Sequence, residues 1–242
     1  MAAFHIGTTF KNTAGGRHVA GDELLIEHVD LRGATILDIG ASDGATSVDL
    51  IERLGDSFAA YVITDRLLGL DAVVLGRHAV FFDSGDRCIL VAGPGYVAYP
   101  TESRVVALLW RHMMTRAHGE PRSTVTLLNP RALRTIDSDP RVTSQEHDLF
   151  REWGGPPADV IKVANLLNSD YFSEDELLLA LDLLTSALRE GGHLLVMDNP
   201  ADPLDTTATT ALYRRVGRRL EEVAMTVPPP RVTGLVRRRP TP

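Results

Sequence analysis

The stretch that decides the fold of this chain covers residues 36–47 and reads Ile36-Leu37-Asp38-Ile39-Gly40-Ala41-Ser42-Asp43-Gly44-Ala45-Thr46-Ser47. An apolar run meets an acidic residue, small residues then permit a tight backbone turn, and helical spacing begins at Val48. This order predicts a buried strand, a glycine turn and the start of a helix. Such a turn presents backbone N–H groups to a nucleotide-like ligand. The stretch therefore predicts a binding loop and leaves the class of ligand open.

The composition limits the classes of protein to which the chain can belong. Its 242 residues and 44% hydrophobic content are enough for one sizeable core. The net charge of −7 argues against a nucleic-acid partner, because phosphate contacts need a surplus of positive charge. The single cysteine, Cys88, excludes a disulfide framework and a thiolate metal site, and we expect no metal. No apolar run reaches membrane-spanning length and residues 1–5 are no signal peptide, so we expect a soluble, cytoplasmic protein without a membrane partner.

Strands and helices alternate along most of the chain. We expect core strands over about 35–39, 59–64, 141–148, 158–165 and 193–198. This alternation predicts an α/β fold with a doubly wound, mostly parallel seven-stranded sheet covered on both faces. A helix over about 207–218 and two final strands over 220–227 and 232–238 follow, and these strands can form a terminal antiparallel hairpin.

One segment interrupts this alternation. Residues 78–91 have the pattern of a β-hairpin around Asp83-Ser84-Gly85-Asp86, and a helix is expected over about 101–117. We therefore interpret the chain as a single domain with an N-terminal arm over 1–20 and an insertion over about 71–135, between the second and third core strands. The helix of the insertion can equally form the surface of a homodimer.

Polar residues stand where the expected core strands end, namely Asp38–Gly44, Asp65, Asp148, Asn165 and Asn199. The carboxyl ends of parallel strands lie at one edge of a sheet, where ligands bind in such folds. We therefore expect these residues to converge on one site.

Two interpretations of the glycine turn rest on general motifs. A dinucleotide site needs Gly-x-Gly-x-x-Gly directly after the strand, and the spacing here departs from it in both the leading acid and the glycines. A serine-hydrolase elbow needs Gly-x-Ser-x-Gly, which residues 40–44 match with Ser42 as nucleophile. That fold also needs several strands before the serine and a late histidine, whereas the last histidine, His193, begins a buried strand. The hydrolase stays open as the weaker alternative.

The third interpretation comes from a family resemblance. Asp38, Gly40, Ser42 and Gly44 resemble motif I of the class I, Rossmann-like S-adenosylmethionine-dependent methyltransferases, with serine at the middle glycine position. The resemblance implies S-adenosyl-L-methionine as cofactor and S-adenosyl-L-homocysteine as product. It therefore implies a methyltransferase that acts on a small-molecule acceptor. A methyltransferase-like binding protein without catalysis is the alternative.

The same resemblance implies roles for the acids at the next two strand ends. Asp65 is placed to accept hydrogen bonds from the ribose hydroxyls, and Asp148 from the adenine amine, with the Leu149 N–H available to a ring nitrogen. The other expected cofactor-binding residues are Ala41, Arg66 and Asn165. His147 is a candidate general base, although a half-buried histidine that completes the strand is the simpler interpretation. The candidate acceptor-binding residues are Tyr96, Tyr99, Asn168 and Tyr171.

Residues 157–200 resemble more narrowly the chemotaxis-receptor methyltransferases and their stand-alone relatives. In that family the fourth strand runs into Arg-Asn-x-Leu-x-Tyr-Phe, followed by a leucine-rich helix, Gly-Gly and a buried strand. The segment here reads Ala164-Asn165-Leu166-Leu167-Asn168-Ser169-Asp170-Tyr171-Phe172, with alanine at the arginine position and a longer spacing. We carry over the cofactor chemistry and not the receptor-glutamate substrate. Within the preceding strand, Lys162 stands among apolar residues and needs a nearby acid as partner.

Overall fold

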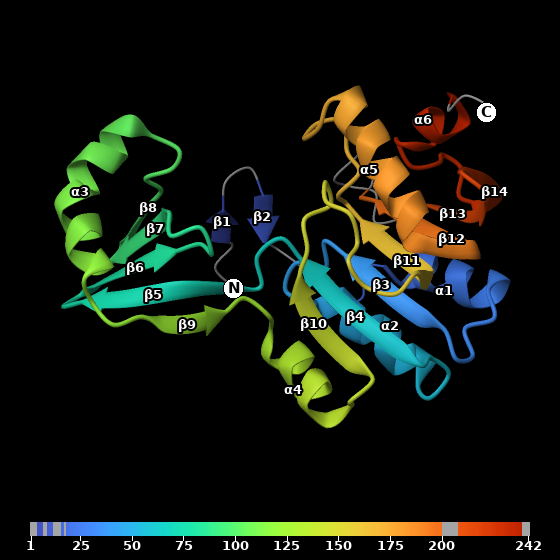
Figure 1. Ribbon diagram of the computed structural model, residues 1–242, viewed down its shortest axis with the longest axis horizontal. Coiled ribbons are helices and arrows are strands. Elements are labelled where there is room, and N and C mark those ends of the chain that lie inside the picture. Colours follow the sequence, from blue (N-terminus) through green and yellow to red (C-terminus); the bar gives the residue numbers. More distant parts are fainter. Residues whose placement is uncertain (1–3, 7–8, 12–15, 17, 200–207, 239–242) are drawn as a thin grey trace. The chain divides into compact units, whose positions relative to one another are not determined.

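The computed structural model describes residues 4–6, 9–11, 16, 18–199 and 208–238, so much of the predicted N-terminal arm lies outside the described residues (Figure 1). The chain forms two compact units, one of residues 1–12 and 67–129 and the other of residues 13–66 and 130–242. Each unit has a sheet and a core of its own.

The larger unit is built on a seven-stranded sheet of order β10-β4-β3-β11-β12-β13-β14. Its strands are β3 (Thr35–Ile39), β4 (Ala60–Asp65), β10 (Val142–Glu146), β11 (Ala158–Ala164), β12 (Leu188–Asp198), β13 (Thr209–Val216) and β14 (Arg219–Met225). The pairs from β10 to β12 are parallel, and β13 is antiparallel to both of its neighbours. The expected mostly parallel seven-stranded sheet is confirmed, and its terminal antiparallel hairpin is formed by β13 and β14, whereas the expected hairpin joined 220–227 to 232–238. The order of the strands reverses between β3 and β11, which is where a ligand site is expected in such a sheet.

Helices cover both faces of this sheet. They are α1 (Val19–His28), α2 (Ala45–Leu54), α4 (Pro130–Ser138), α5 (Glu174–Ala187) and α6 (Thr233–Arg238). Leu37, Val163 and Val196 project to the face covered by α5 and α6, where they form an apolar cluster with leucines of those helices. Side chains of opposite parity, such as Asp38 and Lys162, project to the face of α1 and α2.

The sequence predictions for the C-terminal part are wrong in two places. The helix expected over 207–218 is strand β13 in its described part, and the strand expected over 232–238 is helix α6. Residues 210–213 are buried one after another, because β13 is covered on both faces, and a continuous apolar run does not show a strand's alternation. In addition, the strand expected over 193–198 is longer, because β12 begins at Leu188 and includes Gly191-Gly192.

The smaller unit carries an antiparallel sheet of order β8-β7-β6-β5-β9. Its strands are β5 (Gly69–Leu75), β6 (His78–Phe82), β7 (Cys88–Gly93), β8 (Tyr96–Ala98) and β9 (Ser123–Thr126). The predicted hairpin is β6–β7, whereas β5 and β8 were not expected. Helix α3 (Arg104–His118) packs Trp110, Met113 and Ala117 against this sheet, and β1 (Phe4–Ile6) pairs with β2 (Thr9–Lys11).

The outer side of α3 leaves three large apolar side chains, Val105, Leu108 and Leu109, exposed. This is the helix whose surface the sequence suggests for a homodimer, and that dimer stays a prediction. None of the helices in the described part of the chain combines the length and the apolar character that a membrane span requires.

Candidate ligand site at the carboxyl edge of the parallel strands

The glycine turn leaves β3 at the reversal point of the sheet and leads into α2. Three of its residues, Gly40, Ser42 and Gly44, have φ values of 74°, 60° and 80°. Only glycine adopts this left-handed conformation without a steric cost, which explains why positions 40 and 44 are glycine. The N–H of Ala41 donates to the Thr64 carbonyl at 2.9 Å, so the turn is joined to β4 as well as to β3.

Asp65 lies at the end of β4 and bonds directly to this turn. Its Oδ2 accepts a hydrogen bond from the backbone N–H of Ser42 at 2.8 Å. An ionised carboxylate has about four lone-pair sites, so this contact leaves capacity for further donors. The structure therefore brings together Asp65 and the turn, as the sequence predicts, and adds a bond between them.

The next strand end holds His147, Asp148 and Leu149, and the N–H of His147 donates to the Asp65 carbonyl at 2.9 Å. The Oδ1 of Asp148 accepts from the Phe150 N–H at 3.0 Å, and its Oδ2 lies 4.0 Å from Arg66 Nε. The ring of His147 meets that of Trp153 edge-on, with centroids 5.2 Å apart. Burial lowers the pKa of His147, and the charge of Asp148 offsets this only in part.

Asn165 follows β11 with a φ of 57° and links three segments of the larger unit. Its Oδ1 accepts from the Asn199 N–H at 2.6 Å, and its Nδ2 lies 3.4 Å from His18 Nε2. Asn168 follows in the loop, where its Oδ1 accepts from Arg231 Nη1 at 3.0 Å. Both amides therefore bond to the protein at this edge of the sheet.

The remaining candidates for acceptor binding lie in different places. Tyr171 is exposed in the loop before α5. Tyr96 and Tyr99 belong to the smaller unit, where the ring of Tyr96 stacks on Trp110 with centroids 5.3 Å apart. Their role in a site stays a prediction.

A buried polar cluster lies beneath the glycine turn, on the face covered by α1 and α2. Asp38 is 2% exposed, and its Oδ2 accepts from Ser47 Oγ and from the Tyr61 hydroxyl, both at 2.8 Å. Burial and the Asp38 charge raise the pKa of Tyr61 well above its ordinary value, so its hydroxyl stays a donor. Lys162 Nζ donates to Asp22 Oδ1 at 3.0 Å, which confirms the expectation of an acidic partner. The carboxylate of Asp38 thus faces α2, beneath the turn.

Two features at this edge were not expected from the sequence. Asp198 ends β12 and is 5% exposed; its Oδ2 accepts from the Arg231 N–H at 2.9 Å, whereas its Oδ1 has no partner among the residues that the structure describes. Burial raises the pKa of this carboxyl. Leu166 covers Gly40, because a Cβ added to Gly40 would stand 2.7 Å from Leu166 Cδ2. The place of Asp198 at the end of the apolar run 193–198 could have indicated its role from the sequence. Nothing in the sequence indicates the contact of Leu166 with Gly40.

His193, the last histidine of the chain, lies too far from Ser42 to act as its general base. His193 pairs with Val160, which in turn pairs with Ile36 near the start of β3. At about 3.3 Å per residue, the remaining length of the strand separates His193 from the turn by roughly 13 Å. The serine-hydrolase interpretation therefore loses the late histidine that it requires.

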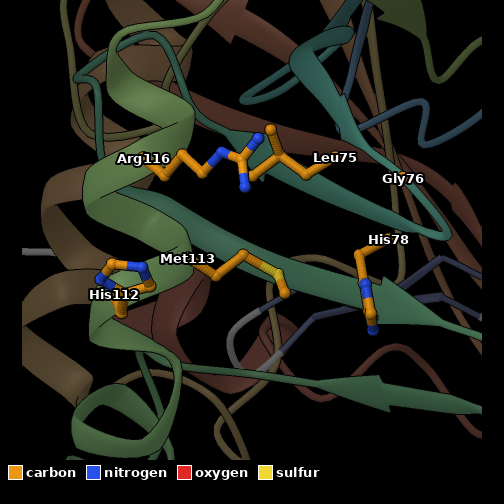
Figure 2. Close-up of a pocket in the computed structure, with 6 residues that line it drawn as sticks. All are labelled: Leu75, Gly76, His78, His112, Met113 and Arg116. Carbon is orange, nitrogen blue, oxygen red and sulfur yellow. The ribbon is translucent and has the colours of Figure 1, made fainter.

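Figure 2 shows a different hollow, which lies in the smaller unit and has a volume of about 320 Å³. Met113 and Arg116 extend from α3 toward the strands that carry Leu75 and His78 (Figure 2). No residue predicted for the ligand site lines it. Among the described residues, no group of three or more His, Cys, Asp or Glu side chains is arranged to hold a metal ion.

The chain is similar to solved methyltransferase structures. No family model matches the sequence, and no curated protein matches it. The S-adenosylmethionine-dependent methyltransferase SibL is 18% identical over 77% of this chain and 37% of its own, with a TM-score of 0.39. Phosphoethanolamine N-methyltransferase 1 of Haemonchus contortus is 14% identical over 76% of this chain and 26% of its own, with a TM-score of 0.41. The N-methyltransferase NodS of Bradyrhizobium japonicum is 16% identical over 76% of this chain and 62% of its own, with a TM-score of 0.40. The chain thus spans less than two fifths of the first two structures.

Proposed function

We propose that the chain binds S-adenosyl-L-methionine at the carboxyl edge of β3 and β4 and transfers its methyl group to a small-molecule acceptor. The observation that carries this proposal is the left-handed glycine turn at the reversal point of the sheet, joined by 2.8 Å to an acid at the end of the neighbouring strand. The turn offers a tight backbone surface with small side chains to the amino-acid part of the ligand, and Asp65 offers acceptors to a ribose.

The charges around the turn favour a cationic ligand over a diphosphate. Asp38 and Asp22 lie beneath it with one lysine, Lys162, and Asp65 and Asp148 lie at the same edge with one arginine, Arg66, so the acids outnumber these two cations. Carboxylates repel the phosphates of a dinucleotide, whereas they attract an ammonium and a sulfonium. This pattern supports S-adenosyl-L-methionine against the dinucleotide interpretation.

Each predicted residue has a definite task in this proposal. Gly40, Ala41, Ser42 and Gly44 form the turn, and Asp38 acts on the ligand through the turn because its carboxylate faces α2. Asp65 binds the ribose. Asp148 accepts from the adenine amine and the Leu149 N–H donates to a ring nitrogen. The other cofactor contacts are assigned to Arg66 and Asn165, with Asn168 and Tyr171 on the acceptor side.

The residues of the chain mainly bind and align the reactants. When bound, the cofactor supplies an electrophilic methyl group on a sulfonium. Holding an acceptor atom in line with that methyl can contribute roughly 7–11 kcal/mol to the lowering of the barrier. An acceptor O–H or N–H would lose its proton on methylation, and His147 is the residue of the chain that would take it. The lowered pKa of His147 keeps its ring neutral at pH 7, in the form that accepts a proton.

Calorimetric titration with S-adenosyl-L-homocysteine tests the binding step. We expect the wild-type chain to bind, and Asp65→Ala to weaken binding at least about tenfold, which corresponds to about 1.4 kcal/mol. Asp30→Ala is the matched control, because Asp30 is an exposed acid whose described side-chain partner is Arg32. Absence of binding by the wild type to S-adenosyl-L-homocysteine and S-adenosyl-L-methionine would refute the proposal.

Transfer of a radiolabelled methyl group to a broad panel of small molecules tests the catalytic step. Binding without transfer to any member of the panel would favour the binding protein without catalysis. Covalent labelling of Ser42 by a fluorophosphonate probe would instead favour the hydrolase, although His193 lies far from Ser42.

A further inference from the structure

A fully buried ion pair lies directly below the candidate site. Lys162 is 0% exposed and Asp22 is 1% exposed, and Nζ and Oδ1 are 3.0 Å apart. The same ammonium donates to the backbone carbonyl of Thr46 at 3.3 Å. Lys162 therefore connects three elements: its own strand β11, helix α1 through Asp22, and the first turn of α2 through Thr46.

Stability alone is a weak reason for such a pair. The removal of two charges from water costs more than their attraction returns in many proteins, and apolar residues of similar volume do as well or better. A second polar contact reaches the same turn of α2 from the sheet, because Asp38, the register partner of Lys162 in β3, accepts from Ser47 Oγ. Two consecutive residues of α2, Thr46 and Ser47, are thus held from below by adjacent strands.

The place of these contacts in the chain gives them their significance. Helix α2 begins at Ala45, immediately after the glycine turn, so the position of its first turn determines where the backbone of residues 41–44 lies. That backbone is the surface that a ligand of this edge would contact. The backbone bond from Gly44 N–H to Ala41 carbonyl, at 3.0 Å, makes the turn and the helix start one continuous piece.

We propose that Lys162 and Asp22 are positioning residues for the glycine turn. They act without touching a ligand: the ammonium fixes the Thr46 carbonyl, Asp22 fixes the ammonium, and the turn is presented in one arrangement. The predicted effect on cofactor affinity rests on the proposed function, whereas the effect on the turn itself does not.

Amide hydrogen exchange of the chain without ligand tests the effect on the turn. In Lys162→Met we expect residues 40–48 to exchange at least tenfold faster than in the wild type, while α5 keeps its protection. The matched control is Glu23→Gln, which removes an exposed pair, Glu23 Oε1 to Arg53 Nη2 at 2.7 Å, that also joins α1 to α2. Glu23→Gln is expected to leave exchange of residues 40–48 unchanged. Unchanged exchange of this segment in folded Lys162→Met would overturn the proposal.

A double variant separates positioning from stability, and it serves where Lys162→Met alone does not fold. Lys162→Met with Asp22→Leu removes both charges, so we expect the melting temperature to return toward that of the wild type. The turn still lacks its tie at the Thr46 carbonyl, so fast exchange of residues 40–48 and at least tenfold weaker binding of S-adenosyl-L-homocysteine are expected to remain. Recovery of the exchange pattern together with stability would show a purely structural pair and overturn the proposal. Wild-type protein that binds no S-adenosyl-L-homocysteine refutes the proposed function, and the exchange result still decides this inference.

Discussion

Replacement of Gly40 by alanine tests the geometry of the turn more directly than any other change. Gly40 has a φ of +74°, and an added Cβ would stand 2.7 Å from Leu166 Cδ2. The left-handed conformation costs an L-residue about 1–2 kcal/mol. The contact with Leu166 is shorter than Cβ atoms tolerate, so the end of that side chain has to move, at a cost of about 0.5–1.5 kcal/mol for an off-rotamer position.

Part of this cost is offset in the unfolded chain, because alanine has fewer conformations to lose than glycine, a gain of about 0.4–1 kcal/mol. We therefore expect Gly40→Ala to lower the free energy of unfolding by about 0.5–3 kcal/mol. For a chain of this size each kcal/mol lowers the melting temperature by about 2–4 °C. Thermal unfolding followed by circular dichroism is sensitive enough to measure this difference.

Gly33 provides the matched control for this prediction. It has a similar φ of +68°, but an added Cβ would meet nothing within 4 Å. Gly33→Ala therefore carries the conformational cost without the contact, and Gly40→Ala should be the less stable of the two. Leu166→Ala should also cost less in the Gly40→Ala background than in the wild type, by about 0.5–1.5 kcal/mol. Equal stability of the two alanine variants, or additive effects with Leu166→Ala, would refute the contact.

Three further changes test other parts of the larger unit. Tyr61→Phe removes a buried donor to Asp38 and should lower the free energy of unfolding by about 1–3 kcal/mol, measured by urea denaturation. The folded pKa of Asp198 is raised, so its contribution to stability is present below the unfolded pKa of about 3.9 and is lost as pH rises through the folded pKa. Asp198→Asn should therefore melt higher than the wild type at pH 7, and the gain should shrink as pH falls toward 4; a gain independent of pH would contradict this cause. Ser173→Ala breaks the capping box with Glu176 and should cost about 1 kcal/mol in thermal unfolding, and an unchanged melting temperature would contradict that role.

The parallel core of the larger unit could be predicted because its sequence signals are local. The apolar run that ends at Ile39 is bounded by a glycine on each side, and β3 covers Thr35–Ile39 as expected. The capping box at Ser173 fixes the start of α5 in the same way. Where such signals are weak, the observed boundaries of an element differ from the expected ones. Gly191-Gly192 has the composition of a helix end, yet it lies within β12.

The errors in the C-terminal part arise from tertiary contacts that the sequence does not show. Strand β13 is covered on each side, so residues 210–213 are all buried and neither a period of two nor a period of 3.6 stands out. The short helix α6 buries Leu235 and Val236, and the Tyr213 hydroxyl lies 2.8 Å from Thr233 Oγ1. Tertiary contacts of this kind decide between helix and strand, and the sequence contains no local record of them.

For the candidate site, the sequence predicts at which strand end an acidic residue lies better than it predicts where its side chain points. Asp65 and Asp148 stand at strand ends as expected, because the end of an apolar run is visible in a sequence. The direction of the Asp38 side chain was not visible, because both faces of β3 are buried and its parity alone names no partner. The bond from Ser42 to Asp65 likewise joins residues 23 positions apart and depends on the pairing of β3 with β4.

For Lys162, the need for an acidic partner can be predicted from the sequence, whereas the identity of that partner depends on the fold. A lysine among apolar residues requires a partner, yet that partner is 140 positions away in the sequence, in a helix that precedes the sheet. The fold places both on one face, and the register of β3 with β11 puts Asp38 beside Lys162 at the point where the order of the strands reverses. The opposite face at the same positions is an apolar cluster of Leu37, Ile161 and Val163. The buried charges are therefore concentrated on the side where α2 begins, below the turn, while apolar packing against α5 holds the other side of the sheet. This division leads to a comparison between the two faces. When two substitutions lower the free energy of unfolding equally, the one on the polar face should disturb the turn more than the one on the apolar face.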